Sequence, residues 1–545
     1  MQKRIDNALK RVASAWLPCQ RAAQLTCVAG LLCLVGLQAG ARRLKVLAIG
    51  NSFSQDAVEQ YLWELAASQG DTLTIGNAYI GGCSIDRHWQ NAQTDAPAYK
   101  YRKVVGGQRT ERDSSSLGFI VADEPWDVIT MQQVSQLSGD TTSYGSLPLL
   151  IGYVRQTFAE RYILPAQRSR RSRRQQDRVA ADTVAMPELM WHLTWAYPQH
   201  SKSGPFRTVY HGDQQTMYRR ILEAADHELP LVGIRRRIPS GIAVQRARRA
   251  LGDVLNRDDI HLSLGEGRYT AACTWCEMLT GGMVLGNAYR PAGMSVQTAR
   301  LLQSAAHKAV MNDSLGWNDS LRVLWLGTRG TFYADVPLML QRLAGEARLP
   351  LSLTTRLKRS SAPGAFADDG LTQQLLAQGC WDYVLIQEPA AEPDDMLRRA
   401  AHRLFPYDRS IDMAVMSGSP DARIIYFNTW GQHGDCYPVD YPMQRAETQS
   451  LQLQLNATRP HATAEWTPLR SSQWAAGVGH AWRRALLRRP DITLYDKRRH
   501  RPTTEGSYLT ACVLLRAMTG QTVSASYTAG LPLHTARALQ QLAAD

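Results

Sequence analysis

The sequence predicts an α/β fold with mostly parallel sheets, and three features of the chain carry that prediction. Short apolar runs alternate with amphipathic helical patterns over most of the 545 residues. Turns that contain glycine separate the two kinds of segment. The same ordered series of segments occurs twice, once in each half of the chain. Alternating strands and helices build a parallel sheet with helices on both faces, so each half is expected to form such a sandwich.

The first segments of the chain show this alternation most clearly. "KVLAIG", Lys45–Gly50, is a strand candidate, and the turn "GNSFS" follows it directly. "DVITMQ" and "LMWHLTWAY" are further strand candidates. In such sheets ligands bind beyond the carboxyl ends of the strands, so Ser52 of the first turn is expected at a functional site. The helix after this turn is predicted from one apolar face, which comprises Ala57, Val58, Tyr61, Leu62, Leu65 and Ala66.

Five blocks of the first half have counterparts in the second half, in the same order. The offset between paired blocks varies, which indicates that the loops differ in length. We therefore predict a leader at 1–41, a first domain at 42–311, a linker of polar turn formers at 312–320 and a second domain at 321–545. The paired blocks begin at Arg43 and Leu321, Trp126 and Trp381, Leu193 and Asn428, Gly267 and Gly506, and Gly293 and Gly530.

The composition is that of an ordinary globular protein, with 44% hydrophobic and 20% charged residues. Much of the formal net charge of +14 lies at the N-terminus and in "RSRRSRR", Arg168–Arg174. No nucleic-acid-reading motif accompanies this charge, so no nucleic-acid partner is expected. The insertion Gln167–Thr183 has no counterpart in the second half and is predicted to be an exposed loop.

The N-terminus has the features of an export signal. A basic residue, Arg21, precedes an apolar run, Leu25–Leu37, which is too short for an easy membrane span. Small residues follow, and they fit signal-peptidase cleavage after Ala41. We expect an exported protein, periplasmic or extracellular, with no stable membrane partner unless this segment is retained as an anchor.

The cysteines indicate neither a disulfide scaffold nor a metal site. Nine cysteines in 545 residues are sparse for a disulfide-rich protein. "CTWC", Cys273–Cys276, has the redox spacing but lies within an apolar helical pattern, which favours buried packing. No metal-ligand cluster and no phosphate-binding glycine loop is present in the sequence, so no cofactor and no metal are expected.

A serine, an aspartate and a histidine of the first half are candidates for catalysis. A serine hydroxyl becomes a good nucleophile only with an adjacent base, a group that orients the base and donors for the oxyanion. Ser52 lies on the strand-to-helix turn that supplies such donors, although a serine there also fits a helix cap. Asp258 and His261 are three residues apart, so one loop turn brings the carboxylate to the imidazole.

The ordered motifs "GNSFS", "GGCSI", "DVITMQQ" and "DDIHLS" resemble those of the SGNH (GDSL-type) hydrolase superfamily. The chain is most similar to a bacterial SGNH-like family of undetermined function, found largely in exported proteins. The resemblance implies a three-layer, flavodoxin-like α/β/α fold in each half. It also implies that Ser52 is the nucleophile, His261 the base and Asp258 the residue that orients the base.

The resemblance also suggests which groups form the oxyanion hole. In the superfamily the donors are the N–H of the nucleophile, a glycine N–H of the second motif and an asparagine side chain of the third. Ser52 and Gly82 fit the first two positions. The third motif here has no asparagine, and Gln132 or Gln133 stands in its place as a longer amide donor.

Two aromatic residues, Trp195 and Tyr197, lie in a segment that is expected to end a strand near this site. They would form an apolar wall for a sugar ring. The alternative is that both belong to the core, with their polar tips hydrogen-bonded.

The second half keeps the apolar framework of the first but not its candidate catalytic residues. Ser52 aligns with Arg329, the aspartate position with Arg498 and the histidine position with Arg501. A shifted register would bring in Asp496 and His500 but no serine. We therefore expect a catalytically silent domain. Its arginines would clamp a carboxylate or sulfate, or the domain would only support its partner.

These observations predict an exported serine esterase that forms an acyl-enzyme on Ser52. The expected substrate is an acylated small molecule or polysaccharide, with an O-acetyl group on a carbohydrate favoured by the resemblance. A glycan-binding or scaffolding protein with two inert domains is one alternative. A lipid or thioester hydrolase with the same three residues is another.

Overall fold

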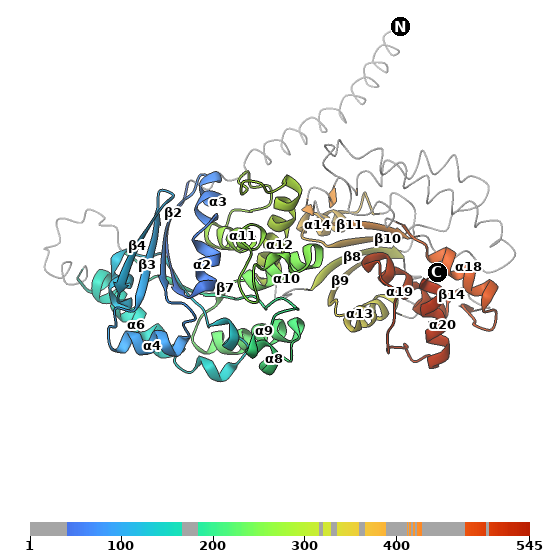
Figure 1. Ribbon diagram of the computed structural model, residues 1–545. Coiled ribbons are helices and arrows are strands. Elements are labelled where there is room, and N and C mark those ends of the chain that lie inside the picture. Colours follow the sequence, from blue (N-terminus) through green and yellow to red (C-terminus); the bar gives the residue numbers. More distant parts are fainter. Residues whose placement is uncertain are drawn as a thin grey trace, which may run out of the picture.

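Figure 1 shows the computed structural model, which describes residues 41–165, 184–314, 320–328, 335–358, 366–387, 411, 414–415, 418–419, 422–427, 475–496 and 501–544. The predicted leader, apart from Ala41, and the insertion Gln167–Thr183 lie outside these residues. The helix that ends the first half continues to Ser314, so the first residues of the predicted linker are helical. The domain boundaries themselves remain a prediction. No helix in the described part of the chain is long and apolar enough to cross a membrane.

A seven-stranded sheet, the N-terminal sheet, has the strand order β4-β3-β2-β1-β5-β6-β7. All neighbours from β2 to β7 in this order are parallel. β3 and β4 form an antiparallel extension at one edge. The strands are β1 (Arg43–Gly50), β2 (Thr72–Tyr79), β3 (Tyr99–Val105), β4 (Gln108–Ser115), β5 (Val128–Met131), β6 (Glu188–His192) and β7 (Arg236–Ile238).

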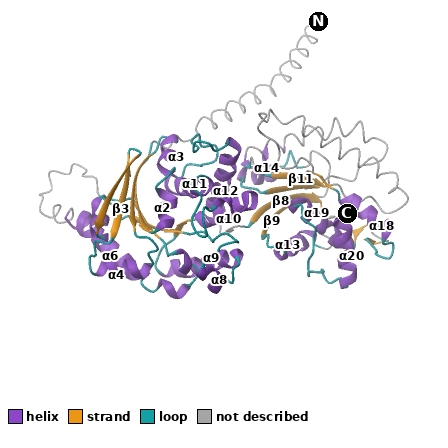
Figure 2. Ribbon diagram, viewed as in Figure 1, coloured by secondary structure: helices purple, strands orange, loops and turns teal. Residues whose placement is uncertain are grey.

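Helices cover both faces of this sheet (Figures 1 and 2). One layer holds α2 (Ser52–Val58), α3 (Leu62–Ser68), α10 (Ser240–Leu251), α11 (Glu266–Thr280) and α12 (Val296–Ser314). The other holds α4 (Ile85–Gln93), α5 (Leu117–Asp123), α6 (Leu147–Phe158) and α9 (Gln214–Leu231), with the short α8 (Gly204–Val209) beside α9. The predicted α/β class is therefore confirmed.

The helix predicted after the first turn is in fact two helices, α2 and α3. The helix is interrupted between Val58 and Leu62, where Tyr61 has a left-handed backbone with φ of 69°. The Tyr61 hydroxyl donates to the Leu264 carbonyl at 2.8 Å, and its ring packs edge-on against Tyr269. These contacts come from the far end of the first half, so the helical periodicity of the segment did not reveal the break.

A five-stranded sheet, the C-terminal sheet, has the order β12-β11-β10-β8-β9, and all its neighbours are parallel. By the sequence repeat β8 corresponds to β1 and β10 to β5, and β9 pairs with β8 as β2 pairs with β1. This order therefore repeats that of the parallel part of the N-terminal sheet. Alternate residues of β8 enter two different cores, because Val323 and Trp325 belong to one cluster while Leu324 and Leu326 belong to another. The strands are β8 (Leu321–Thr328), β9 (Leu351–Lys358), β10 (Tyr383–Gln387), β11 (Arg423–Phe427) and β12 (Ala475–Ala476).

Most of the helices described in the second half lie on one face of the C-terminal sheet (Figure 2). This layer comprises α13 (Val336–Glu346), α18 (Val478–Arg488), α19 (Thr504–Thr519) and α20 (Leu533–Ala544), and α14 (Gly370–Gln378) packs on the opposite core. A two-stranded sheet pairs β13 (Tyr495–Asp496) with β14 (Arg501–Pro502).

Buried polar contacts join the two halves. Both carboxylate oxygens of Asp382, just before β10, accept from Arg246 of α10 at 2.7 and 2.8 Å. Lys308 of α12 lies 3.1 Å from the same carboxylate. Nearby, His307 Nε2 lies 3.3 Å from the Cys380 sulfur, and His307 Nδ1 lies 2.7 Å from Glu277 of α11.

The "CTWC" segment is part of the core, as predicted. Cys273 and Cys276 lie in α11, have no exposed surface and carry free thiols. Burial raises the pKa of the Cys276 thiol to about 12, which suppresses the reactive thiolate.

Candidate active site

Ser52 lies where the sequence predicted it, at the carboxyl end of β1 and the start of α2. The helix cap is its neighbour Asn51, which has extended backbone and accepts the Phe53 N–H at 3.0 Å. The Ser52 hydroxyl is therefore not used as a cap. Position 50, the last residue of β1, favours glycine, because a Cβ there would lie 2.6 Å from the Ser54 hydroxyl oxygen.

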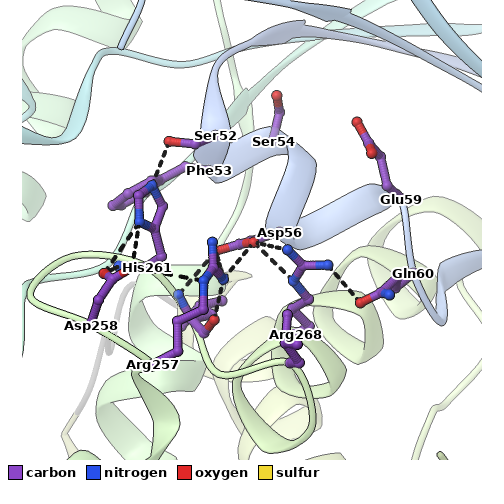
Figure 3. Close-up of polar contacts among 12 residues, drawn as sticks. Ser52, Phe53, Ser54, Asp56, Glu59, Gln60, Arg257, Asp258, His261 and Arg268 are labelled. Atoms are coloured by element: carbon purple, nitrogen blue, oxygen red, sulfur yellow. Dashed lines mark hydrogen bonds and ion pairs between the residues drawn. The ribbon is translucent and has the colours of Figure 1, made fainter. Parts of the chain in front are cut away.

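His261 and Asp258 meet Ser52 in a hydrogen-bonded series (Figure 3). His261 Nε2 lies 2.9 Å from the Ser52 Oγ, and its Nδ1 lies 2.9 Å from the Asp258 Oδ2. The other Asp258 oxygen accepts the backbone N–H groups of His261 at 2.7 Å and of Ile260 at 2.9 Å. One carboxylate thus fixes both the loop and the imidazole ring. Such a series lets the imidazole accept the hydroxyl proton while the carboxylate stabilises the resulting imidazolium.

The environment keeps Asp258 in its charged form. Burial by itself raises its pKa, but hydrogen bonds from the His261 and Ile260 backbone and from the imidazole outweigh this effect and lower the pKa below its ordinary value. The side chain of Asp258 is 46% exposed and that of His261 is 22% exposed. The site is therefore open to solvent on the side of the aspartate.

The loop that contains Gly82 is tied to the turn that bears Ser52. The Asn51 side chain donates to the Cys83 carbonyl at 3.0 Å, which fastens this loop to the turn that bears Ser52. Gly82 has a left-handed backbone with φ of 61°, and no atom lies where a Cβ would be built. Within the described residues, neither the Ser52 nor the Gly82 backbone N–H has a protein acceptor. Both N–H groups can therefore donate to a ligand.

The two glutamines of the third motif have other roles than the one predicted. Gln132 is buried, and its amide donates to the Asn51 Oδ1 at 2.8 Å while its oxygen lies 2.7 Å from His192 Nδ1. The Gln133 amide donates to the Ser143 carbonyl at 2.8 Å. Burial lowers the pKa of His192 to about 3, so this imidazole is neutral at neutral pH. The expectation that Gln132 donates to the oxyanion is therefore corrected: its amide donates to the Asn51 side chain instead.

Trp195 and Tyr197 do not form an open wall, which corrects the second expectation. Their exposed fractions are 0% and 2%. Trp195 stacks on Phe53 with ring centroids 4.1 Å apart and donates through its indole N–H to the Ile260 carbonyl at 3.0 Å. The Tyr197 hydroxyl is 2.8 Å from that of Ser135. The alternative, that both are core residues with satisfied polar tips, is confirmed.

A charged cluster beside the site was not predicted from the sequence. Asp56 of α2 has no exposed surface. Arg257, from the loop that bears His261, and Arg268, from α11, both bind its carboxylate (Figure 3). The sequence holds no clear signal for it, because Asp56 lies in a short helix, SFSQDAV, that mixes polar and apolar residues. Only the fold identifies its partners, since they lie 201 and 212 residues away.

The corresponding region of the second half is described only in part. Arg329, Arg498 and His500 lie outside the described residues, so the predicted convergence of arginines is not visible. Arg501 of β14 pairs through its backbone with Asp496 of β13. At the end of β8, Gln387 accepts the Thr328 N–H at 2.8 Å, which resembles the link between Gln132 and Asn51.

No group of three or more histidine, cysteine, aspartate or glutamate residues in the described ranges has the geometry to hold a metal ion.

Fold and site together define an α/β protein with a serine, a histidine and an aspartate in hydrogen-bonded series at the carboxyl ends of a parallel sheet. The chain belongs to the family described as a domain of unknown function, DUF4886, which its residues 45–166 and 176–309 match. A crystal structure of a DUF4886 family protein from Bacteroides uniformis is 44% identical to it and has a TM-score of 0.44. The similarity covers 50% of this chain and 96% of that protein.

A gut microbial diltiazem-metabolizing enzyme is also similar, at 12% identity and a TM-score of 0.24. That similarity covers 44% of this chain and 48% of the enzyme. No functionally curated protein matches the chain.

Proposed function

We propose that the first half of this protein is a serine hydrolase of the SGNH type that cleaves acyl esters through an acyl-enzyme on Ser52. The observation that supports this most is the hydrogen-bonded series from Ser52 through His261 to Asp258, with 2.9 Å at each step. The order of groups, nucleophile to Nε2 and carboxylate to Nδ1, is the one that general-base activation of a serine needs.

The proposed reaction begins when the Ser52 oxygen attacks the ester carbonyl and His261 Nε2 takes the hydroxyl proton. The tetrahedral oxyanion accepts hydrogen bonds from the free backbone N–H groups of Ser52 and Gly82. The C–O bond to the leaving alcohol then breaks, and the imidazolium returns its proton to that alcohol. Water, deprotonated by His261, then attacks the acyl-enzyme carbonyl; the bond to the Ser52 oxygen breaks, the imidazolium returns its proton to that oxygen, and the carboxylic acid is released.

We infer that the acyl group is small and that the alcohol belongs to a carbohydrate, such as an O-acetylated sugar. The support for this step is the resemblance to exported bacterial relatives, together with the export signal predicted at 1–41. In this proposal the protein works outside the cytoplasm.

A fluorophosphonate probe, which phosphonylates activated serines, tests the proposal directly. The full-length protein is treated beside Ser52→Ala and a matched control, Ser116→Ala, which removes the serine that caps α5. We expect wild type and the control to be labelled and Ser52→Ala to be silent.

Labelling that persists in Ser52→Ala would assign the reaction to another serine. A folded wild-type protein that is not labelled would contradict the hydrolase and favour the glycan-binding alternative. Acetate release from acetylated glycans, compared with turnover of long-chain lipid and thioester substrates, then decides the substrate class.

A further inference from the structure

A buried carboxylate lies one helical turn below the proposed nucleophile. Asp56 is four residues after Ser52 on α2, so both side chains project from the same helix. Asp56 has no exposed surface at all. An unpaired buried carboxylate is strongly destabilising, so its partners must matter to the site.

Three groups from the other end of the first half bind this carboxylate (Figure 3). Arg257 Nη1 lies 2.9 and 3.0 Å from its two oxygens. Arg268 binds one oxygen with Nε at 2.9 Å and Nη2 at 2.6 Å. The backbone N–H of Leu262 donates to the other oxygen at 3.0 Å. Both oxygens of Asp56 are therefore occupied by donors that come from the loop of His261 and from the helix after it.

These contacts bracket the histidine in sequence. Leu262 is the next residue after His261, and Arg257 lies on its other side. The loop is also closed on itself, because Arg257 N–H and the Asn256 side chain both donate to the His261 carbonyl at 3.1 Å. The loop is thus a compact unit, and Asp56 is the point at which this unit is fastened to the helix that carries the nucleophile.

The chemistry of the cluster requires a carboxylate. A guanidinium has only donors, and two of them face Asp56. An asparagine has one acceptor oxygen, and its amide hydrogens would face the guanidinium hydrogens. Arg257 and Arg268 side chains are only 32% and 9% exposed, so water cannot fully replace the lost partner.

We propose that Asp56 is a positioning residue that sets the distance between the Ser52 hydroxyl and His261 Nε2 by fastening the histidine loop to α2. Asp258 orients the ring within the loop, and Asp56 places the whole loop. The inference rests on the proposed function for its consequence in catalysis, while the fastening itself is a property of the fold.

The test compares Asp56→Asn with Asp313→Asn. Asp313 of α12 is a control of similar chemistry, because its partly buried carboxylate, 13% exposed, accepts from Arg237 Nε at 2.7 Å. We expect both variants to unfold at lower denaturant, but only Asp56→Asn to react more slowly with the fluorophosphonate, by about 10- to 100-fold. The loss is expected in the rate at saturation and in kcat, with KM unchanged.

Hydrogen exchange provides a readout that does not depend on the reaction. The Ile260 and His261 amides are bonded to Asp258, not to Asp56, so they exchange faster in Asp56→Asn only if the loop as a whole is released. We expect this acceleration in Asp56→Asn and not in Asp313→Asn. Unchanged exchange at these amides would overturn the fastening, whether or not the wild type reacts.

Two further outcomes separate the inference from the proposed function. A wild type that is not labelled, with exchange accelerated as expected, overturns the hydrolase and keeps the fastening. A labelled wild type with an equally fast Asp56→Asn overturns the positioning role. If Asp56→Asn does not fold, Arg257→Lys takes its place: it keeps the charge but removes the contact to both oxygens, and a smaller slowing with faster loop exchange is expected.

Discussion

His261 Nε2 lies 2.9 Å from the Ser52 Oγ, although 209 residues separate the two side chains in sequence. One of them opens the helix after the first strand, and the other lies in the loop before α11. Packing of α11 against α2 and α3 brings these segments together at one end of the N-terminal sheet. The same contact makes the proposed chemistry depend on a few side chains that can be changed singly.

Replacement of Asp258 by asparagine should lower kcat by about 10²- to 10⁴-fold with little change in KM. The Asp258 Oδ2 accepts from His261 Nδ1, and an amide cannot stabilise the imidazolium in the same way. Initial rates on a small acetyl ester measure the effect. A kcat close to that of wild type would show that another group orients the imidazole.

Alkylation of cysteines should leave the activity intact. Cys83 lies beside the site, because its backbone carbonyl accepts from the Asn51 side chain. Burial raises the pKa of its thiol to about 12. Because only the thiolate is nucleophilic, iodoacetamide at neutral pH is not expected to modify this residue in the folded protein. Activity is measured before and after treatment, with fluorophosphonate as the positive control. A loss of activity in step with alkylation of Cys83 would point to a thiol nucleophile.

Asp382→Asn should destabilise the protein far more than Asp127→Asn. Asp127 is the counterpart of Asp382 in the first half, since the paired blocks begin with Trp126-Asp127 and Trp381-Asp382. Burial raises the pKa of Asp382, but Arg246 and Lys308 outweigh it and hold the pKa well below its ordinary value. Its loss leaves two buried cations without a partner and is expected to lower the free energy of unfolding by about 3–5 kcal/mol. Asp127 is exposed, and among the described residues its carboxylate accepts the Lys45 N–H alone, so about 1 kcal/mol is expected there.

Urea unfolding of both variants measures this difference. Equal shifts in the two variants would mean that the contacts of Asp382 across the two halves add nothing beyond the local backbone hydrogen bond that both aspartates make.

Stability should fall at alkaline pH because of His307. Burial lowers its pKa, but hydrogen bonds to Cys380 and Glu277 outweigh burial and raise the pKa from 6.5 to about 10. A raised pKa means that the fold favours the protonated imidazole. Its contribution is therefore complete below pH 6.5 and is lost as the pH rises through about 10.

Thermal unfolding of wild type and His307→Gln across this pH range checks the assignment. The variant should be less stable near pH 6.5, and its melting temperature should change less between there and pH 10. Parallel curves for the two proteins would mean that another group causes the alkaline decline.

Much of the fold could be read from local patterns. Strand–turn–helix alternation predicted the α/β class, and the block repeat predicted two copies of one domain. The structure adds that the two sheets share one order of parallel strands. The break at Tyr61 was missed, because the hydroxyl of this residue binds Leu264, far along the chain. Periodicity reports which residues share a face, and it does not register a contact that bends the backbone.

The candidate site divides in the same way. The spacing of Asp258 and His261 is local, so their contact could be anticipated from three residues of separation. Whether Gln132 and Trp195 are exposed depends on which segments pack against them in the fold, and both are buried. A polar or aromatic residue at the end of a strand has the same sequence signature whether it faces solvent or the core.

The amino-acid order alone specified the α/β alternation, the duplicated framework and the short-range pairing of an aspartate with a histidine, because each is encoded within a few turns of backbone. Three-dimensional packing settled which side chains share the space around Ser52. The burial of Asp56 between two arginines and the closure of the histidine loop onto α2 arise only when segments more than 200 residues apart touch. Such long-range contacts leave no periodic trace in a sequence, since burial and pairing are properties of the assembled surfaces.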